Sequence, residues 1–429
     1  MRTATIRRLA YVAVGVVAVG VRWAFVDFQS GDFVAFLSRW WSYIDQHGHL
    51  AALQDGSFSN YNTPYLVLLA LATYLPVRAI AAIKAISIAF DVLLAVTASR
   101  LVAAVRPRAG WLPFVTFAVV SLLPTVVMNS GVWAQCDSIY ATFCLASLVS
   151  LVRGRPWAAS AWFGVAFAFK LQAVFLLPVL VGVLLTNRLR LRTLVAAPVT
   201  FLACLVPALI AGRSLLSQLA VYPAQISDPS GVGGTVGGAA SGGGAPGGAM
   251  PGGPGTPGVP GGRGGPAGGV PAAAPAAQTA TLTHNAPTPY AWLPSSTIWL
   301  YVGLAVTALV VVAFGVWLLL RKTPLSGGEI VLVAATSTLL IPLLLPQMHE
   351  RYFYLAEVLL VVACMVDWRF LVPALGIQIA SISTYFGYLR NQSLMPLGAA
   401  AGFAVAAGLA TAWLLVRTLR ASPRAEPVS

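Results

Sequence analysis

Residues 297–320, TIWLYVGLAVTALVVVAFGVWLLL, decide the class of fold. This stretch has no charged side chain, and a helix of about 20 apolar residues is long enough to cross a bilayer. Comparable runs recur along nearly the whole chain of 429 residues, of which 58% are hydrophobic and 9% charged, with a mean hydropathy of +0.82. Because soluble domains carry about 25% charged residues, the sequence predicts an all-α polytopic membrane protein.

We expect about 12 membrane-spanning helices in this chain. Their approximate bounds are 8–26, 80–104, 111–128, 138–152, 157–168, 172–186, 193–211, 297–320, 328–345, 353–367, 370–388 and 396–417. The first has no cleavage site with a soluble domain behind it, so we expect a retained span. Residues 27–79 are predicted to form a long helical first outer loop, with an amphipathic stretch at about 32–55 and a short apolar one at about 64–76.

Short clusters of Lys and Arg between the spans account for the net charge of +14. These clusters are Arg7-Arg8, Arg106 and Arg108, Arg153 and Arg155, Arg188, Arg190 and Arg192, Arg321-Lys322, Arg369, and Arg417, Arg420 and Arg424. With a cytoplasmic N-terminus all of them fall on one side, as the positive-inside rule requires. We therefore expect both termini in the cytoplasm and the positive charge against lipid head groups, with no nucleic-acid partner. Counting 64–76 as a span would break this rule.

Residues 228–287 differ in composition from the rest of the chain. Gly, Pro and Ala dominate, and only Asp228, Arg263 and His284 are ionisable. Such a segment cannot bury enough surface to offset its ordering entropy, so we predict a disordered insertion in an outer loop. It divides an N-terminal membrane module, 1–227, from a C-terminal one, 288–429. A partner-binding or wall-spacer role for the insertion stays open.

The first outer loop collects acidic, basic and aromatic side chains near the membrane surface. They are Asp27, Asp32, Arg39, Trp40, Trp41 and His47. A carboxylate within hydrogen-bond reach can activate a hydroxyl as a general base, and aromatic rings supply faces for sugars. The pattern is equally typical of an interfacial amphipathic helix with tryptophans at head-group level, and the residues alone leave both interpretations open.

Two further polar groups lie at the outer ends of predicted spans. Trp133, Gln135 and Asp137 precede a span, where the aspartate either lines a site or only caps the helix. Lys170 and Gln172 occupy a tight outer turn. The lysine needs an anionic partner there, a carboxylate or a lipid phosphate, unless it snorkels to the surface.

A third group, His349-Glu350-Arg351, could hold a phosphate. The guanidinium offers a bidentate fork, the imidazole a second donor, and the carboxylate can orient either one. The H-E-x-x-H pattern of a zinc site is not completed, because Phe353 stands in place of its second histidine.

Metal binding elsewhere is weakly indicated. A site built from Asp32, Asp137 and His349 stays open. The cysteines have no C-x-x-C spacing and are predicted to be packed thiols: Cys136, Cys144, Cys204 and Cys364.

The content of these motifs resembles the GT-C superfamily of polytopic glycosyltransferases, in the branch that uses polyprenyl- or dolichyl-phosphate sugars. Gly31-Asp32-Phe33 with Trp40 downstream resembles the Gly-Asp-aromatic…Trp signature of the first outer loop. Residues 60–66, NYNTPYL, resemble the Tyr-Pro-Pro-Leu segment that closes this loop, with Thr63 in place of a proline.

Later motifs follow in the same order as in that superfamily. Residues 84–91 resemble its basic-then-acidic second span, and residues 133–138, 169–172 and 349–351 resemble three further motifs. Arg351 stands where lysine is frequent. The resemblance covers the chain outside the insertion and implies a GT-C-type bundle.

The resemblance also implies an activity and a set of site residues. Asp32 is the expected base, and Lys170, His349 and Arg351 the expected ligands of the donor phosphate, with Arg22 or Lys84 as helpers. Supporting or substrate-binding residues are expected to be Asp27, Arg39, Trp40, Tyr61, Trp133, Gln135, Asp137, Gln172 and Glu350. An acceptor hydroxyl would attack the anomeric carbon with inversion. No cofactor is expected, although a divalent metal stays open.

The donor sugar is expected by analogy with other members of the superfamily that the chain resembles. The nearest-looking bacterial relatives resemble the mannosyl branch, so mannose is favoured over glucose, arabinofuranose and galactose. The acceptor is a glycolipid, a lipoglycan or a wall polysaccharide. The Ala-, Gly-, Val- and Arg-rich usage suits a bacterium of high genomic GC, with the site on the outer face of the plasma membrane.

Two alternatives remain from the sequence. A secondary transporter would use Asp91, Lys170 and Glu357 for ion coupling, but the halves show no internal repeat and the polar motifs gather outside the membrane. A non-catalytic lipid-binding protein of the same fold is the other, and the presence of both Asp32 and His349-Glu350-Arg351 speaks against it.

Overall fold

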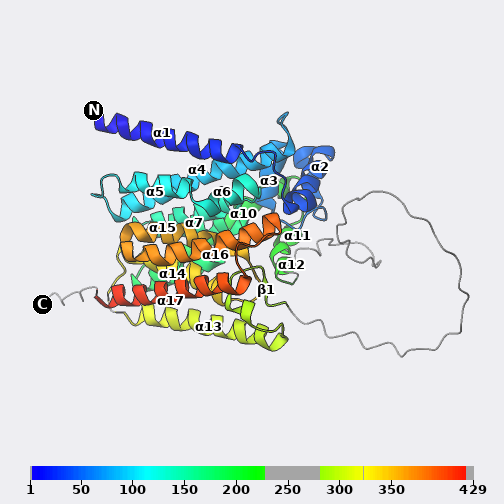
Figure 1. Ribbon diagram of the computed structural model, residues 1–429. Helices are drawn as coiled ribbons and strands as arrows, with labels where there is room; N and C mark the ends of the chain where they lie inside the picture. The colour runs from blue at the N-terminus through cyan, green and yellow to red at the C-terminus, as the bar shows by residue number, and fades with distance from the viewer. Residues whose placement is uncertain (1, 228–280, 322, 422–429) are drawn as a thin grey trace, which may run out of the picture.

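The computed structural model describes residues 2–227, 281–321 and 323–421. This part of the chain is almost entirely helical (Figure 1). The α-helices are α1 (Arg2–Trp23), α2 (Ser38–Gln46), α3 (Thr63–Ala72), α4 (Ala79–Val105), α5 (Leu112–Ser121), α6 (Pro124–Val127), α7 (Asp137–Val152), α8 (Pro156–Phe169), α9 (Leu177–Thr186), α10 (Ala196–Ile210), α11 (Leu215–Leu219), α12 (Val221–Ser227), α13 (Thr297–Leu319), α14 (Gly327–Leu344), α15 (Tyr354–Val366), α16 (Leu371–Arg390) and α17 (Leu397–Ala421).

Short 3₁₀- or π-helical segments and two short strands join these helices. They are η1 (Phe33–Leu37), η2 (His49–Gln54), η3 (Met128–Val132), η4 (Leu171–Leu176), η5 (Leu191–Val195), η6 (Pro289–Trp292), η7 (Glu350–Phe353), η8 (Trp368–Phe370), β1 (Thr283–His284) and β2 (Met348–His349).

Each predicted span coincides with helical structure, which confirms an all-α polytopic membrane protein. Within the described ranges, six helices are long and apolar enough to cross a bilayer, or seven if a bent pair counts as one span. The bent pair is α5 with the segment 124–132, and the two parts meet at 46°. Pro124 has no N–H to continue the hydrogen-bond ladder of α5. Other predicted spans, such as α7 and α8, coincide with shorter apolar helices.

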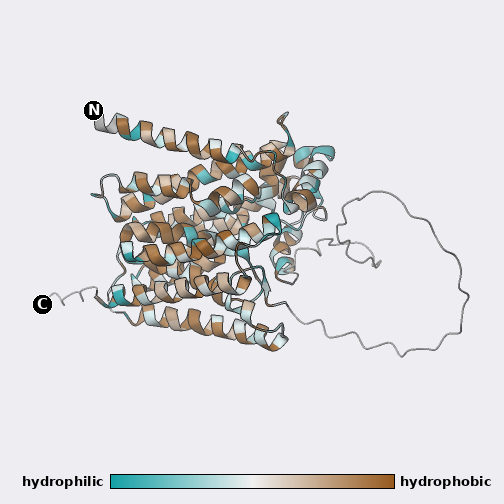
Figure 2. Ribbon diagram, viewed as in Figure 1, coloured by the Kyte–Doolittle hydropathy of each residue, from teal (hydrophilic) through white to brown (hydrophobic). Residues whose placement is uncertain are grey.

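The helices lie side by side, and the chain ends share one end of the bundle (Figure 1). The first turn of α1 and the last turn of α17 lie at the left, whereas α2, α3, α11 and α12 lie at the right. Hydrophobic residues cover most of the helix length, and hydrophilic ones gather at the ends and around α2 (Figure 2). The start of α1 and the end of α17 therefore lie at the same end of the bundle, opposite the first outer loop.

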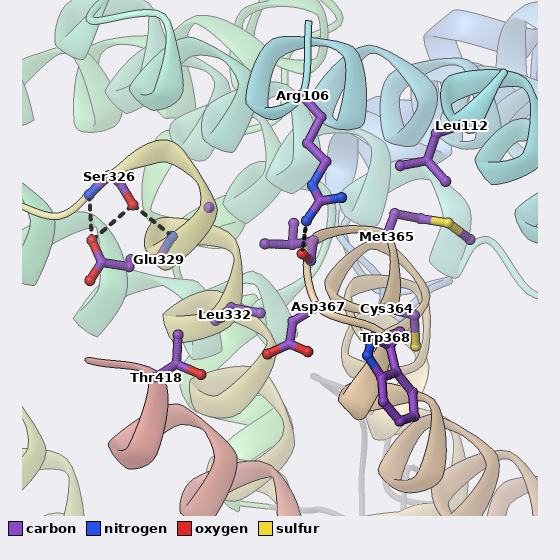
Figure 3. Close-up of a pocket in the computed structure, with 12 residues that line it drawn as sticks. Arg106, Leu112, Ser326, Glu329, Leu332, Cys364, Met365, Asp367, Trp368 and Thr418 are labelled. Atoms are coloured by element: carbon purple, nitrogen blue, oxygen red, sulfur yellow. Dashed lines mark hydrogen bonds between the residues drawn. The ribbon is translucent and has the colours of Figure 1, made fainter. Parts of the chain in front are cut away.

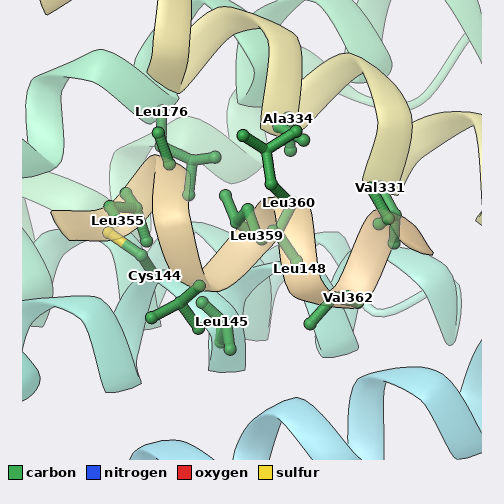
Figure 4. Packing of buried hydrophobic residues seen from close by; sticks show 14 of the residues in the cluster. Cys144, Leu145, Leu148, Leu176, Val331, Ala334, Leu355, Leu359, Leu360 and Val362 are labelled. Carbon is green, nitrogen blue, oxygen red and sulfur yellow. The ribbon is translucent and has the colours of Figure 1, made fainter. Parts of the chain in front are cut away.

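The core of the bundle is built around α15. This helix lies between α7 and α14, and its Leu355, Leu359 and Leu360 pack in one cluster with Leu148 and Val331 (Figure 4). Because lipid tails are as apolar as leucine, close packing and polar contacts between helices supply most of the cohesion here. The buried helix α15 fixes η7, which precedes it, and so the segment that carries Arg351.

The first outer loop contains both predicted helical stretches. Trp40, Trp41 and Ile44 are buried on one face of α2 and pack in a cluster with Tyr65 and Leu69 of α3. Gly48, at φ +84°, takes the left-handed conformation that turns the chain from α2 into η2. Helix α3 has ten residues, about 15 Å long, and is too short to span a bilayer core of about 30 Å.

The end of the predicted insertion needs a correction. Residues 228–280 of that prediction lie outside the described residues, but residues 281–287 are placed. Strand β1 pairs in parallel with β2, so that His284 lies opposite His349. Among the described residues, 281–287 therefore belong to the C-terminal module, although the sequence assigns them to the insertion. Composition cannot reveal this, because the pairing is made by backbone groups.

The predicted state of the cysteines is confirmed. Cys136 and Cys144 are buried free thiols, and Cys204 and Cys364 are half-buried free thiols.

Candidate active site

The Asp32 carboxylate lies at the start of a π-helical turn and faces the loop before α7. The Ser30 hydroxyl donates to the Trp133 carbonyl oxygen at 2.7 Å and accepts from the Phe33 N–H at 3.2 Å. These bonds tie the first outer loop to the segment around Trp133. That segment leaves the π-helix η3 and turns at Ala134, where φ is +66°. Single π-helical turns are frequent at functional sites.

Four donors converge on the Asp32 carboxylate. Its Oδ2 accepts from Trp133 Nε1 at 3.0 Å, Gln135 Nε2 at 2.6 Å and Arg351 Nη1 at 3.2 Å. Its Oδ1 accepts from the Tyr388 hydroxyl. The side chain is 15% exposed, so the carboxylate is fixed in orientation and still reachable from outside the protein.

Trp133 forms the rigid wall behind this carboxylate. Its ring is fully buried and stacks on Tyr388 at a centroid distance of 4.5 Å and 23°. Tyr385 meets it edge-on at 5.1 Å, and the Arg351 guanidinium lies 5.5 Å from its centroid. A cation over an indole face is attracted by the ring quadrupole. The arrangement holds Arg351 beside Asp32.

A buried ion pair lies behind the Asp32 group. Lys170 Nζ lies 2.5 Å from Asp137 Oδ1, and Asn129 Nδ2 donates to Asp137 Oδ2 at 2.9 Å. The extended backbone of Lys170 interrupts the helix between α8 and η4. The partner of this lysine is therefore a carboxylate, one of the two alternatives left by the sequence.

The segment His349-Glu350-Arg351 links both groups. Burial raises the pKa of the Glu350 carboxyl to about 7, Arg351 opposes that rise, and the charges of Asp32 and Asp137 add to it. The Asp32 group and the Lys170–Asp137 pair are joined by the segment 133–137, in which Trp133 and Gln135 donate to Asp32 and Asp137 pairs with Lys170. His349 stacks on His284 at a centroid distance of 4.9 Å and meets Tyr352 edge-on at 5.3 Å.

Three supporting residues from the sequence lie around this site. Trp40 packs on Tyr61 at a centroid distance of 5.5 Å, and the Tyr61 hydroxyl lies 3.1 Å from Cys136 Sγ. Gln172 is buried beside the hydroxyl of Tyr352. These side chains extend the site toward the first outer loop and toward η4.

Other expected residues are not brought to the Asp32 carboxylate. Asp27 pairs with Arg78 at 2.7 Å on the surface, where its side chain is 73% exposed. Arg39 is exposed on α2, opposite the face that buries the tryptophans. Arg22 is buried against Asp91 at 2.6 Å.

Lys84 likewise has protein partners, since its Nζ donates to the carbonyl oxygens of Phe25 and Phe28 at 2.6 and 2.7 Å. Neither Arg22 nor Lys84 therefore points at the site as the expected helper of the phosphate ligands.

Sequence reasoning missed Tyr388 and Asn129. Both belong to apolar runs, in which one tyrosine or asparagine does not stand out from its neighbours. His284 was assigned to the insertion, although pairing of β1 with β2 brings it to His349.

The sequence left open a metal site at Asp32, Asp137 and His349. In the described part of the chain, no three His, Cys, Asp or Glu side chains lie close enough together to hold a metal ion. Asp32 and Asp137 each face a cation of the protein instead.

Comparison with known proteins gives one family. A sequence model described as glycosyltransferase family 87 matches residues 58–234, which include Tyr61, Trp133, Gln135, Asp137 and Lys170. The curated proteins contain no match to the chain. Family 87 is of the GT-C type, so its match over residues 58–234 confirms the predicted resemblance and supports a multi-pass membrane glycosyltransferase.

Proposed function

We propose that the protein transfers a sugar from a polyprenyl-phosphate donor to an acceptor hydroxyl with inversion at the anomeric carbon. The observation that carries this proposal is the contact between Asp32 and Arg351, 3.2 Å apart. A carboxylate that can take a proton lies beside a cation that can bind a phosphate. Displacement of a sugar from a phosphate needs both groups at one place.

Asp32 acts as the general base in this proposal. It accepts the proton of the acceptor hydroxyl, whose oxygen forms a bond to the anomeric carbon from the face opposite the phosphate. The bond between the anomeric carbon and the phosphate oxygen breaks, and its electron pair stays on polyprenyl phosphate. The hydrogen bonds from Trp133, Gln135 and Tyr388 keep the carboxylate aimed at the acceptor.

Arg351 stabilises the charge that develops on the leaving phosphate. Its Nη1 donates to Asp32, while its buried Nε–H donates to no partner among the described residues. A guanidinium has five N–H donors, so it can serve a carboxylate and a phosphate together. His349 lies two residues earlier, and Lys170, which is paired with Asp137, is a further basic side chain of the same site. We propose that these cations suffice without a metal ion.

Mannose is the sugar that we propose, transferred on the outer face of the plasma membrane to a glycolipid, lipoglycan or wall polysaccharide. The motif resemblance supports the sugar. The shared end of α1 and α17, opposite the Asp32 group, supports the outer location together with the basic clusters between spans (Figure 1).

Membranes that carry the protein test this proposal directly. They are incubated with a lipid extract and labelled polyprenyl-phosphate mannose, and in parallel with the glucose, galactose and arabinofuranose donors and with nucleotide-linked mannose. We expect label in an extracted glycan only from polyprenyl-phosphate mannose, with inverted anomeric configuration and no loss in a chelator. Transfer directly from the nucleotide sugar would refute the donor assignment, and ion-coupled solute uptake without transfer would favour a transporter.

A further inference from the structure

A pocket lies at the end of the bundle opposite the Asp32 group. It has a volume of about 600 Å³, within the range of about 300–1,000 Å³ typical of small-molecule sites. Its walls come from the end of α4, the start of α14, the end of α15 with η8, and the end of α17 (Figure 3). The 13 residues of α15, about 20 Å in length, separate it from η7.

Arg106 supplies the positive charge of this pocket. Its side chain points from the end of α4 into the pocket (Figure 3), where its Nη2 donates to the Val366 carbonyl oxygen. Within the described residues no carboxylate forms an ion pair with it. A guanidinium has five N–H donors, so most of them remain for a ligand.

The two carboxylates that line the pocket are already neutralised. Asp367 is held by Arg369 through Nε at 2.9 and 3.0 Å and Nη2 at 2.5 Å. Glu329 pairs with Arg321 at 3.2 Å and forms a capping box with Ser326 at the start of α14. Because these charges cancel in pairs, Arg106 leaves the pocket with a net positive charge. An anion is the ligand that this charge favours.

The surface beside the pocket suits hydrocarbon chains. Trp368 is 76% exposed at its rim, and Val372, Leu375 and Ile379 are exposed on α16 below it. The spacing of i, i+4, i+7 and i+11 puts these four side chains on one helix face. This apolar stripe runs from the pocket toward the middle of the bundle. Tryptophan is enriched at the membrane–water interface, so the pocket lies at head-group level.

We propose that this pocket binds the head group of an anionic phospholipid from the adjacent leaflet. Arg106 binds the phosphate, and the acyl chains lie along the exposed face of α16. Basic pockets between helices at this depth hold acidic lipid head groups in other membrane proteins. The proposal concerns binding alone and does not depend on the transfer reaction.

Lipid binding to the purified full-length protein in detergent tests the proposal. Native mass spectrometry and the apparent Tm are measured with phosphatidylglycerol, with phosphatidylcholine and with inorganic phosphate. We expect phosphatidylglycerol to bind best and to raise the apparent Tm, and Arg106→Gln to weaken it about tenfold, as for one charge-assisted hydrogen bond. Arg108→Gln is the matched control, because this exposed arginine does not line the pocket, and it should bind like the wild type.

Trp368→Ala provides a second variant with an intact fold, since the exposed side chain contributes little packing. It should also weaken phosphatidylglycerol binding. Equal binding by the wild type and Arg106→Gln, or an equal loss in Arg108→Gln, would overturn the site. Protection by inorganic phosphate as strong as by phosphatidylglycerol would overturn the lipid as its ligand.

Discussion

The guanidinium of Arg351 lies 3.2 Å from the carboxylate of Asp32, although 319 residues separate them in the chain. One belongs to the first outer loop and the other to the turn between α14 and α15. Their contact joins the two halves of the bundle at one point. It also makes the proposed base and the proposed phosphate ligand neighbours, and four predictions follow from the groups around them.

Tyr388→Phe removes one hydrogen bond to the Asp32 carboxylate and keeps the ring that stacks on Trp133. A hydrogen bond to a charged group contributes about 1.5–3 kcal/mol, so we expect kcat to fall about 10-fold or more, with little change in the KM for the donor. Steady-state transfer kinetics measure both constants. Tyr301→Phe is the control, because that tyrosine is exposed on α13; an unchanged kcat in Tyr388→Phe would remove the positioning role.

We expect the effects of mutating Lys170 and Asp137 on the stability of the fold to be strongly non-additive. Both side chains are almost fully buried, and loss of one partner leaves an uncompensated charge at a cost of about 3–5 kcal/mol. Lys170→Met and Asp137→Asn should each lower the apparent Tm steeply, and the double variant should be more stable than the sum of both losses implies. Thermal unfolding in detergent measures this cycle.

The exposed pair Arg78–Asp27 supplies the control for that cycle, since its side chains are 69% and 73% exposed. Arg78→Met and Asp27→Asn should change the apparent Tm little, because surface pairs contribute about 0–1 kcal/mol. Additive losses at Lys170 and Asp137 would show that the pair does not interact as the structure indicates.

Glu350 gives a prediction about pH. Burial raises the pKa of its carboxyl from 4.5 to about 7 in the folded protein. Between these values the folded state holds a proton that the unfolded chain has released, so stability decreases as pH rises through this window. Glu350→Gln cannot titrate. The apparent Tm of this variant minus that of the wild type should therefore increase from pH 4.5 to about 7 and then level off. A constant difference across the window would contradict the raised pKa.

The sequence predicts a large part of this site. Asp32, Trp133, Gln135 and Arg351 are polar or aromatic residues in short motifs beside long apolar runs, and such contrast is visible without a structure. The helices were predicted for the same reason, since the run length that crosses a bilayer is fixed by its thickness. The basic clusters also predict that the first helix begins and the last helix ends on the same side of the membrane.

The sequence could not predict which way a side chain faces, or which residues far apart in the chain come into contact. Arg39 is close to Asp32 in the chain, yet its side chain is exposed on α2, outside the face that buries the tryptophans. Tyr388 lies 356 residues from Asp32 and reaches it only because α16 packs beside the first outer loop. The partner of Lys170 also required the structure, because a carboxylate and a lipid phosphate satisfy a lysine equally well.

Asp32→Asn tests the central claim most directly, with Asp27→Asn as its matched control on the same loop. Transfer from labelled polyprenyl-phosphate mannose is measured for both variants after their apparent Tm has shown that they are folded. Loss of a general base lowers the rate by about 10²–10⁴-fold, so we predict that Asp32→Asn retains at most about 1% of the wild-type rate and that Asp27→Asn keeps it in full. Full transfer by a folded Asp32→Asn variant would contradict the account.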